Sequence, residues 1–244
     1  MEQQYDRYTA EDHEVWRILF ERQVKNLADK SCTLHLQTLN EMREVLYAEK
    51  IPDFTALNAF LLGKTGWQIQ VVKGLIPVDE FFDLLADKKF PSSTWLRTRA
   101  QLDYLEEPDM FHDIFGHIPL FADAEYADLM QKIGLFSRAN NHETELTNQL
   151  ERFYWFTIEF GLMRENASIN SATKGQKIYG AGIISSFGES NSIYETVVKI
   201  KPFNLGEVIH HSFIKSEMQP EYFYVQSISQ VRDELEKLIR LKKK

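Results

Sequence analysis

Residues 107–120 read Glu-Pro-Asp-Met-Phe-His-Asp-Ile-Phe-Gly-His-Ile-Pro-Leu, and the rest of the chain is organised around them. This stretch places His112 and His117 five positions apart in an apolar run. On a regular α-helix that spacing turns the two imidazole rings about 140° apart, which is too far for both to bind one ion. We therefore predict a helix break between them, with Gly116 as the C-terminal cap and Pro119 preventing continuation. The alternative is a pair of hydrogen-bonded core histidines.

Composition narrows the class of protein. The chain has 244 residues, 43% of them hydrophobic, with a formal net charge of −8 and a single cysteine, Cys32. That length is enough for one large core, and the negative charge makes a nucleic-acid partner unexpected. One cysteine excludes an intrachain disulfide and a cysteine-rich metal site. The first residues lack a secretory pattern, and no apolar run approaches the roughly 20 residues of a membrane helix, so we expect a cytoplasmic protein without a membrane partner.

Hydrophobic periodicity indicates a mainly α-helical chain with a few short β-strands. Thr9 is the expected N-cap of the first helix, with Asp12 at the third helical position as in a capping box. The expected helices cover residues 10–27, 34–46, 57–62 (closed by Gly63), 78–86, 125–133, 143–163 and 231–241, and the expected strands cover residues 67–71, 94–97 and 222–225. No internal repeat or clear linker interrupts these elements, which favours a single domain.

Glu159 is the candidate for a third metal ligand. It is a lone carboxylate in the apolar run 153–162, where burial without a partner costs several kcal/mol. With His112 and His117 it completes two histidines and one carboxylate, the ligand set of non-haem iron(II) oxygenases. Zinc stays open, because some hydrolases use the same ligand types. Their His-Glu-x-x-His spacing is not found here, so the spacing favours iron slightly.

Three blocks of sequence carry a resemblance to a known family. They are residues 104–120, residues 154–162 (Tyr-Trp-Phe-Thr-Ile-Glu-Phe-Gly-Leu) and residues 179–189 (Tyr-Gly-Ala-Gly-Ile-Ile-Ser-Ser-Phe-Gly-Glu). In order and length they resemble the pterin-dependent aromatic amino acid hydroxylases, and the short form of the chain is similar to the bacterial phenylalanine 4-hydroxylases. The resemblance implies one catalytic domain over residues 1–244, without the regulatory domain and tetramerisation helix of the animal enzymes.

The resemblance also implies an activity. Fe(II) bound by His112, His117 and Glu159 would act with dioxygen and a tetrahydropterin, either tetrahydrobiopterin or a bacterial equivalent. The reaction would be hydroxylation of free L-phenylalanine to L-tyrosine, a step of phenylalanine catabolism. Tryptophan hydroxylation is the alternative, because pocket size decides between the two rings. A zinc-dependent hydrolase is the remaining one. We expect only small-molecule partners, the aromatic amino acid, dioxygen and the tetrahydropterin, and a monomer or weak oligomer.

Further site residues follow from the resemblance. Arg97 is expected to pair with the substrate carboxylate through two hydrogen bonds. Phe81 is expected to stack on the pterin ring. The full set of expected contacts comprises Arg97, Asp109, Trp155 and Ser185 for the substrate, and Gly74, Leu75, Ile76, Phe81 and Asp113 for the cofactor. Leu105 and Glu106 stand where the animal enzymes carry threonine and proline, so a hydroxyl contact to the substrate is lost.

Overall fold

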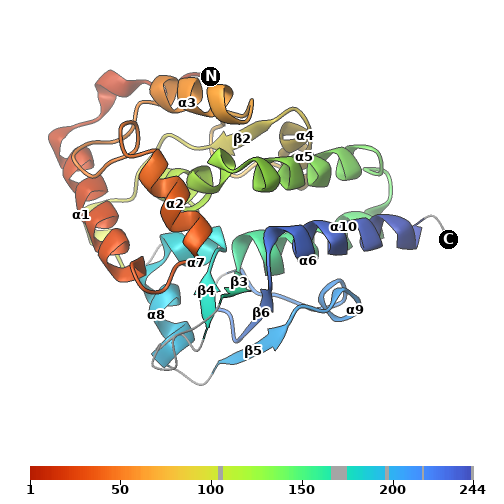
Figure 1. Cartoon of the computed structure of the whole chain (residues 1–244). Helices are drawn as coiled ribbons and strands as arrows, with labels where there is room; N and C mark the ends of the chain where they lie inside the picture. The colour runs from red at the N-terminus through yellow and green to blue at the C-terminus, as the bar shows by residue number, and fades with distance from the viewer. Residues whose placement is uncertain (104–106, 166–174, 196–197, 216, 243–244) are drawn as a thin grey trace.

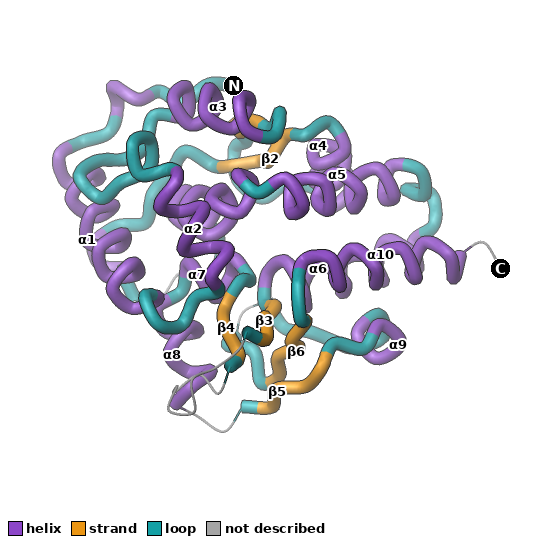
Figure 2. Tube along the Cα trace, viewed as in Figure 1, coloured by secondary structure: helices purple, strands orange, loops and turns teal. Residues whose placement is uncertain are grey.

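The computed structural model describes residues 1–103, 107–165, 175–195, 198–215 and 217–242. Figures 1 and 2 show a mainly helical chain with a small sheet below the long helices, which confirms the expected fold class. The α-helices are α1 (Ala10–Leu27), α2 (Thr33–Glu41), α3 (Phe54–Lys64), α4 (Val78–Ala86), α5 (Ala124–Arg138), α6 (Thr144–Tyr154), α7 (Ala181–Ser185), α8 (Phe187–Glu195), α9 (Leu205–Val208) and α10 (Ile228–Lys242).

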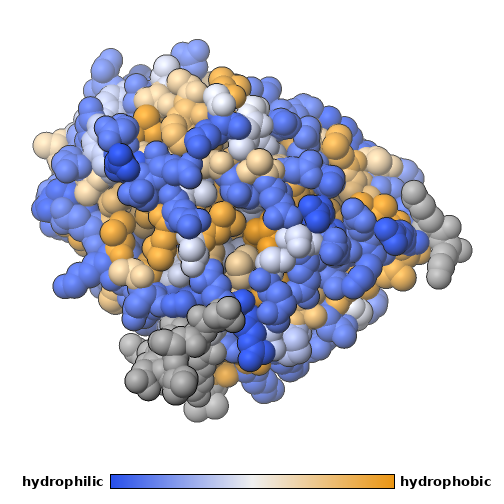
Figure 3. All heavy atoms as spheres, viewed as in Figure 1, coloured by the Kyte–Doolittle hydropathy of each residue, from blue (hydrophilic) through white to orange (hydrophobic). Residues whose placement is uncertain are grey.

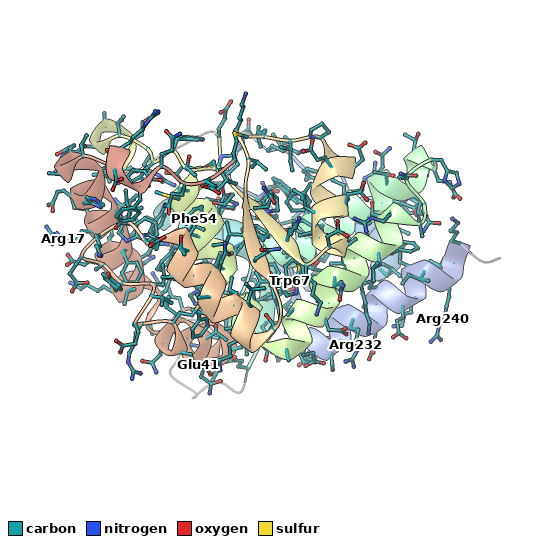
Figure 4. All side chains as sticks on the ribbon, turned by 90° about the horizontal axis from the view of Figure 1, so that it is seen from above. Arg17, Glu41, Phe54, Trp67, Arg232 and Arg240 are labelled. Atoms are coloured by element: carbon teal, nitrogen blue, oxygen red, sulfur yellow. The ribbon has the colours of Figure 1, made fainter. Side chains whose placement is uncertain are left out.

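Shorter helical turns connect these helices. The 3₁₀ turns are η1 (Tyr5–Arg7), η2 (Arg99–Gln101) and η4 (Ile118–Ala122), and the π-helical turns are η3 (His112–His117) and η5 (Trp155–Glu159). In the view of Figure 4, α1 with Arg17 lies at one end of the molecule and α10 with Arg240 at the other. No helix in the described part of the chain combines the length and hydrophobicity needed to cross a bilayer.

The strands form two small sheets. They are β1 (Gln68–Val71), β2 (Lys89–Ser92), β3 (Gly161–Arg164), β4 (Gln176–Ile178), β5 (Lys199–Pro202) and β6 (Glu221–Val225). β1 and β2 pair in parallel, and the second sheet has the order β4-β3-β6-β5, with β3 antiparallel to β4 and the other pairs parallel. Because β3 begins two residues after Glu159, this sheet holds the C-terminal end of η5 in place.

Several expected elements are confirmed. Thr9 Oγ1 accepts a hydrogen bond from the backbone N–H of Asp12 at 3.2 Å, and Asp12 Oδ2 accepts one from the Thr9 N–H at 2.8 Å, which closes the capping box. α4 has the expected bounds, and β1, β6 and α10 lie where the alternation and the helical periodicity place them. These segments form where the local pattern and the tertiary packing agree.

Other expectations were wrong at their boundaries. α2 ends at Glu41, yet Met42 and Leu46 are buried from turns beyond it, so apolar spacing alone overextended the helix. α3 runs through Gly63 to Lys64, and Gly66 with φ +77° takes the left-handed conformation after the helix. The strand expected at 94–97 is not formed; instead β2 covers 89–92. β2 contains Pro91, which an edge strand tolerates because its backbone nitrogen need not donate a hydrogen bond.

The expected helix 143–163 divides into α6, η5 and β3. Leu105 and Glu106 lie outside the described residues, and so do residues 166–174.

The core of the molecule surrounds η3. Phe111 and Phe115 are fully buried and stack with ring centroids 4.8 Å apart, and Trp16 of α1 meets Phe111 edge-on. On the face shown in Figure 3 hydrophilic residues predominate, with apolar residues showing between them.

α4 and α5 approach closely at Gly134, where an added Cβ would lie 2.2 Å from the backbone nitrogen of Ala86. This close approach fixes α4, which carries Phe81.

Candidate metal centre and its pocket

His112 and His117 lie at the two ends of η3, which runs without a break into η4. In a π-helix the hydrogen bonds join residues five apart, so these two side chains lie on the same side of the turn. The predicted break at Gly116 was therefore wrong. Gly116 is buried inside the turn, where a Cβ would lie 2.8 Å from the carbonyl oxygen of Ala181. Its missing side chain allows α7 to pack directly against η3.

Glu159 reaches the two histidines from the end of η5. Its Oε1 lies 3.1 Å from His117 Nε2, and its Oε2 lies 3.8 Å from His112 Nε2. The two Nε2 atoms are 3.3 Å apart, and the ligand atoms of all three residues lie within 4.8 Å of one another. Two π-helical turns, far apart in sequence, thus bring the three predicted ligands together at one point.

Hydrogen bonding around the histidines suits a metal. Ser185 Oγ donates to the carbonyl of Ala181 at 2.9 Å, so it accepts from His112 Nδ1, also at 2.9 Å. The proton of the neutral His112 ring is therefore on Nδ1, and the Nε2 lone pair points toward His117 and Glu159. His117 Nδ1 is buried and has no hydrogen-bond partner among the described residues. Two imidazoles and a carboxylate are ligands that a divalent iron or zinc ion accepts, so the donor set fits.

The protonation states agree with this role. Burial lowers the pKa of His112 to about 4, so the ring is neutral near pH 7. For Glu159 burial opposes ionisation, but the adjacent His117 and His112 outweigh it and lower the pKa of the carboxyl. Neutral imidazole and ionised carboxylate are the forms that bind a metal.

The three ligands open onto a cavity of about 460 Å³, a volume typical of small-molecule sites. Most of the predicted site residues line it. They are Gly74, Leu75, Ile76, Phe81, Arg97, His112, Asp113, His117, Trp155, Glu159 and Ser185. Asp109 does not belong to the lining; its side chain is fully buried behind that of Arg97.

Asp109 holds Arg97 in one orientation. Its carboxylate accepts hydrogen bonds from Arg97 Nε at 2.8 Å and Nη2 at 2.9 Å, and also from the backbone N–H of Arg97 at 2.9 Å. The backbone N–H of His112 donates to the same carboxylate at 3.1 Å. Nη1 is not among these donors, so the edge of the guanidinium formed by Nη1 and Nη2 can bind a second carboxylate end-on. One buried aspartate therefore joins the metal ligand segment to the arginine.

Comparison with known proteins identifies this arrangement. The family model of biopterin-dependent aromatic amino acid hydroxylases matches residues 4–244. The chain belongs to this family. The phenylalanine-4-hydroxylase of Ralstonia nicotianae is 41% identical over 237 residues, which cover 96% of this chain and 72% of the relative.

Two solved structures show the same fold. Phenylalanine hydroxylase from Chromobacterium violaceum, with bound iron(III) and oxidised 7,8-dihydrobiopterin, matches with a TM-score of 0.89 and 39% identity, covering 100% of this chain and 86% of that one. The apo cold-active enzyme from Colwellia psychrerythraea matches with a TM-score of 0.85 and 35% identity, covering 96% and 88%. The hydroxylase fold therefore extends through the whole described chain.

The expected cofactor side of the hydroxylase cavity is aromatic. Phe81 packs edge-on against Tyr154, with centroids 5.4 Å apart, and against Phe90 at 6.2 Å. Asp113 lies nearby; its Oδ2 accepts the backbone N–H of Ser93 at 2.8 Å, and burial raises its pKa to about 7. Sequence reasoning missed Tyr154, because an aromatic residue in an apolar helix is indistinguishable from core until the cavity is seen.

Proposed function

We propose that this hydroxylase binds Fe(II) through His112, His117 and Glu159 and, with a tetrahydropterin and dioxygen, converts L-phenylalanine to L-tyrosine. The observation that carries the proposal is the meeting of three ligand atoms within 4.8 Å on the wall of a cavity that also contains Arg97. Bound iron and pterin supply the oxygen activation and the electrons that protein side chains lack. The relatives' names support phenylalanine as the substrate.

The chain's own residues would position the reactants. Arg97, held by Asp109, presents its second edge to the substrate carboxylate and so orients as well as attracts the amino acid. Trp155 lines the cavity near Glu159 and offers an apolar wall for the substrate ring. Phe81 offers an apolar surface for the pterin ring, and Gly74, Leu75 and Ile76, which also line the cavity, would offer it backbone contacts.

The metal ligands require support that the structure supplies. The Ser185 hydroxyl keeps the proton of His112 on Nδ1, which leaves Nε2 for the metal. Asp113 has a pKa raised by burial to about 7, so near neutral pH this carboxyl can hold or release a proton beside the cofactor position. The cytoplasmic location and the monomeric or weakly associated state stay predictions.

Purified protein tests the proposal. Loaded with Fe(II) and given tetrahydrobiopterin, dioxygen and L-phenylalanine, it should release L-tyrosine, and more slowly hydroxylate L-tryptophan. Glu159→Gln removes the ionised ligand, so we expect weaker iron binding, by roughly 10-fold or more, and loss of tyrosine formation. Glu145→Gln is the matched control, because Glu145 lies on the exposed face of α6, with 69% of its side chain accessible.

Three outcomes would count against the proposal. Full iron affinity and turnover in Glu159→Gln would remove this residue from the ligand set. Faster turnover of tryptophan than of phenylalanine would change the substrate assignment to the alternative. Hydrolytic activity of the zinc-loaded protein without pterin would replace the oxygenase assignment with that of a zinc-dependent hydrolase.

A further inference from the structure

The Trp155 indole is held on several sides. Its ring stacks on Phe213, with centroids 4.3 Å apart and planes 17° apart, and lies against Phe160 at 4.6 Å. Its Nε1–H donates a hydrogen bond of 3.1 Å to Oε1 of Gln219. Of these contacts, the hydrogen bond is the most directional, because it requires the indole N–H to point at the acceptor. The orientation of this cavity wall therefore depends on Gln219.

Gln219 is itself fixed. It is 4% exposed, and its Nε2 donates to the carbonyl oxygen of Ile214 at 2.9 Å and to that of Glu217 at 3.0 Å. Turning the amide over would place its N–H groups against the indole N–H and its oxygen against two carbonyls. Only one orientation satisfies the hydrogen bonds, so the acceptor is always presented to Trp155.

Glu189 anchors the backbone of Gln219 from α8. Its Oε1 accepts the backbone N–H of Gln219 at 2.9 Å and the hydroxyl of Tyr222 at 2.5 Å. Glu189 is 5% exposed and Tyr222 lies on β6, so the anchor is in the protein interior. The cavity wall is thus connected through Gln219 to α8 and to β6, neither of which contains a proposed metal ligand.

We propose that Gln219 is a specificity-determining positioning residue. By holding the Trp155 indole, it fixes the shape of the part of the cavity that would take the substrate ring. That shape favours phenylalanine over the larger tryptophan. Gln219 does not line the cavity, so it acts through Trp155 and not by touching the substrate. This inference rests on the proposed function, and it assigns to Gln219 a role that its position outside the metal site does not reveal.

A double-mutant cycle tests the inference. Gln219→Met keeps the side-chain length but removes the acceptor, so the ratio of kcat/KM for phenylalanine to that for tryptophan should fall about fivefold, the value of one buried neutral hydrogen bond. In the Trp155→Phe background the same change should alter the ratio less than about twofold, because phenylalanine has no N–H to hold. Gln149→Met is the control; Gln149 bonds Glu145 on the surface of α6.

A second readout does not depend on turnover. The indole N–H resonance of Trp155, identified by its loss in Trp155→Phe, should shift and exchange faster with water in Gln219→Met. In Gln219→Glu burial favours the protonated carboxyl, which can accept the indole N–H through one oxygen and donate from the other to the carbonyl oxygen of Ile214 or Glu217, so the resonance and the phenylalanine preference should be retained. This variant keeps the inference testable if Gln219→Met does not fold.

Distinct results would overturn the inference and the proposed function. An unchanged ratio or indole resonance in Gln219→Met would refute the role of Gln219. An equal loss of preference with and without the Trp155 indole, or a loss in Gln219→Glu with the resonance in place, would also refute it. A wild-type chain that hydroxylates no aromatic amino acid would refute the proposed function, whereas the indole resonances would still report whether Gln219 holds Trp155.

Discussion

The contact between α4 and α5 allows a quantitative prediction for Gly134→Ala. The added Cβ would lie 2.2 Å from the backbone nitrogen of Ala86 and 2.6 Å from the carbonyl oxygen of Phe82. Ordinary contact needs at least 3.4 Å, and backbone atoms cannot move as a side chain does, so the helices must separate by about 1 Å. Overpacking of this kind costs up to about 3 kcal/mol, and alanine's better helix propensity returns about 1 kcal/mol. We expect a net loss of about 2 kcal/mol.

Urea unfolding of the variant and its matched control measures this loss. In Gly63→Ala the new methyl group meets nothing within 4 Å, so that variant should be more stable than the parent by about 0.5–1 kcal/mol. Because α4 carries Phe81, Gly134→Ala should also raise the KM for the tetrahydropterin. A Gly134→Ala variant as stable as the parent would show that the two helices are not in such close contact.

Two other residues that are not metal ligands, His35 and Asp109, give further predictions. Burial lowers the pKa of His35 to about 4 from an unfolded value near 6.5, so its contribution to stability is complete above pH 6.5 and is lost as the pH falls toward 4. The urea-derived stability difference between pH 7 and pH 4 should therefore be about 3 kcal/mol smaller in His35→Gln than in the parent; an equal difference would show that His35 does not titrate with this shift. Asp109→Asn breaks a buried ion pair and should lower the free energy of unfolding by about 3–5 kcal/mol. It should also raise the KM for phenylalanine in steady-state assays, and an unchanged KM would mean that Arg97 does not need Asp109 to bind the substrate.

Local chemistry explains which elements the sequence could predict. The Thr9 capping box and the apolar face of α4 are encoded within a few residues, and both form as expected. The π-helical turns could not be predicted in this way. Their hydrogen bonds are less favourable than those of an α-helix, and they persist at η3 because the surrounding core, including Ala181 against Gly116, imposes them. The five-residue spacing of the histidines is the visible sign of this turn in the sequence, but on a regular α-helix the same spacing predicts a break.

The site residues also divide into those that the local sequence predicts and those that only tertiary contacts reveal. Glu159 could be identified from the cost of a lone carboxylate in an apolar run, because that cost holds whatever the fold. The role of Arg97 followed only from resemblance, and the structure adds that Asp109 lies behind it rather than in the cavity. The contact of Gln219 with Trp155 could not be predicted, since it joins residues 64 positions apart. Tertiary contacts of this range leave no periodic signal in the sequence.

The source of the oxygen atom in the product tests the central claim most directly. The Fe(II)-loaded protein, supplied with a tetrahydropterin and L-phenylalanine under oxygen-18 gas, should release tyrosine whose ring hydroxyl carries one oxygen-18 atom, in proportion to the pterin consumed. Mass spectrometry of the tyrosine measures this, with the Glu159→Gln variant giving no labelled product. Pterin consumption without labelled tyrosine, or a hydroxyl oxygen that comes from water, would contradict the assignment of this chain as a phenylalanine-hydroxylating monooxygenase.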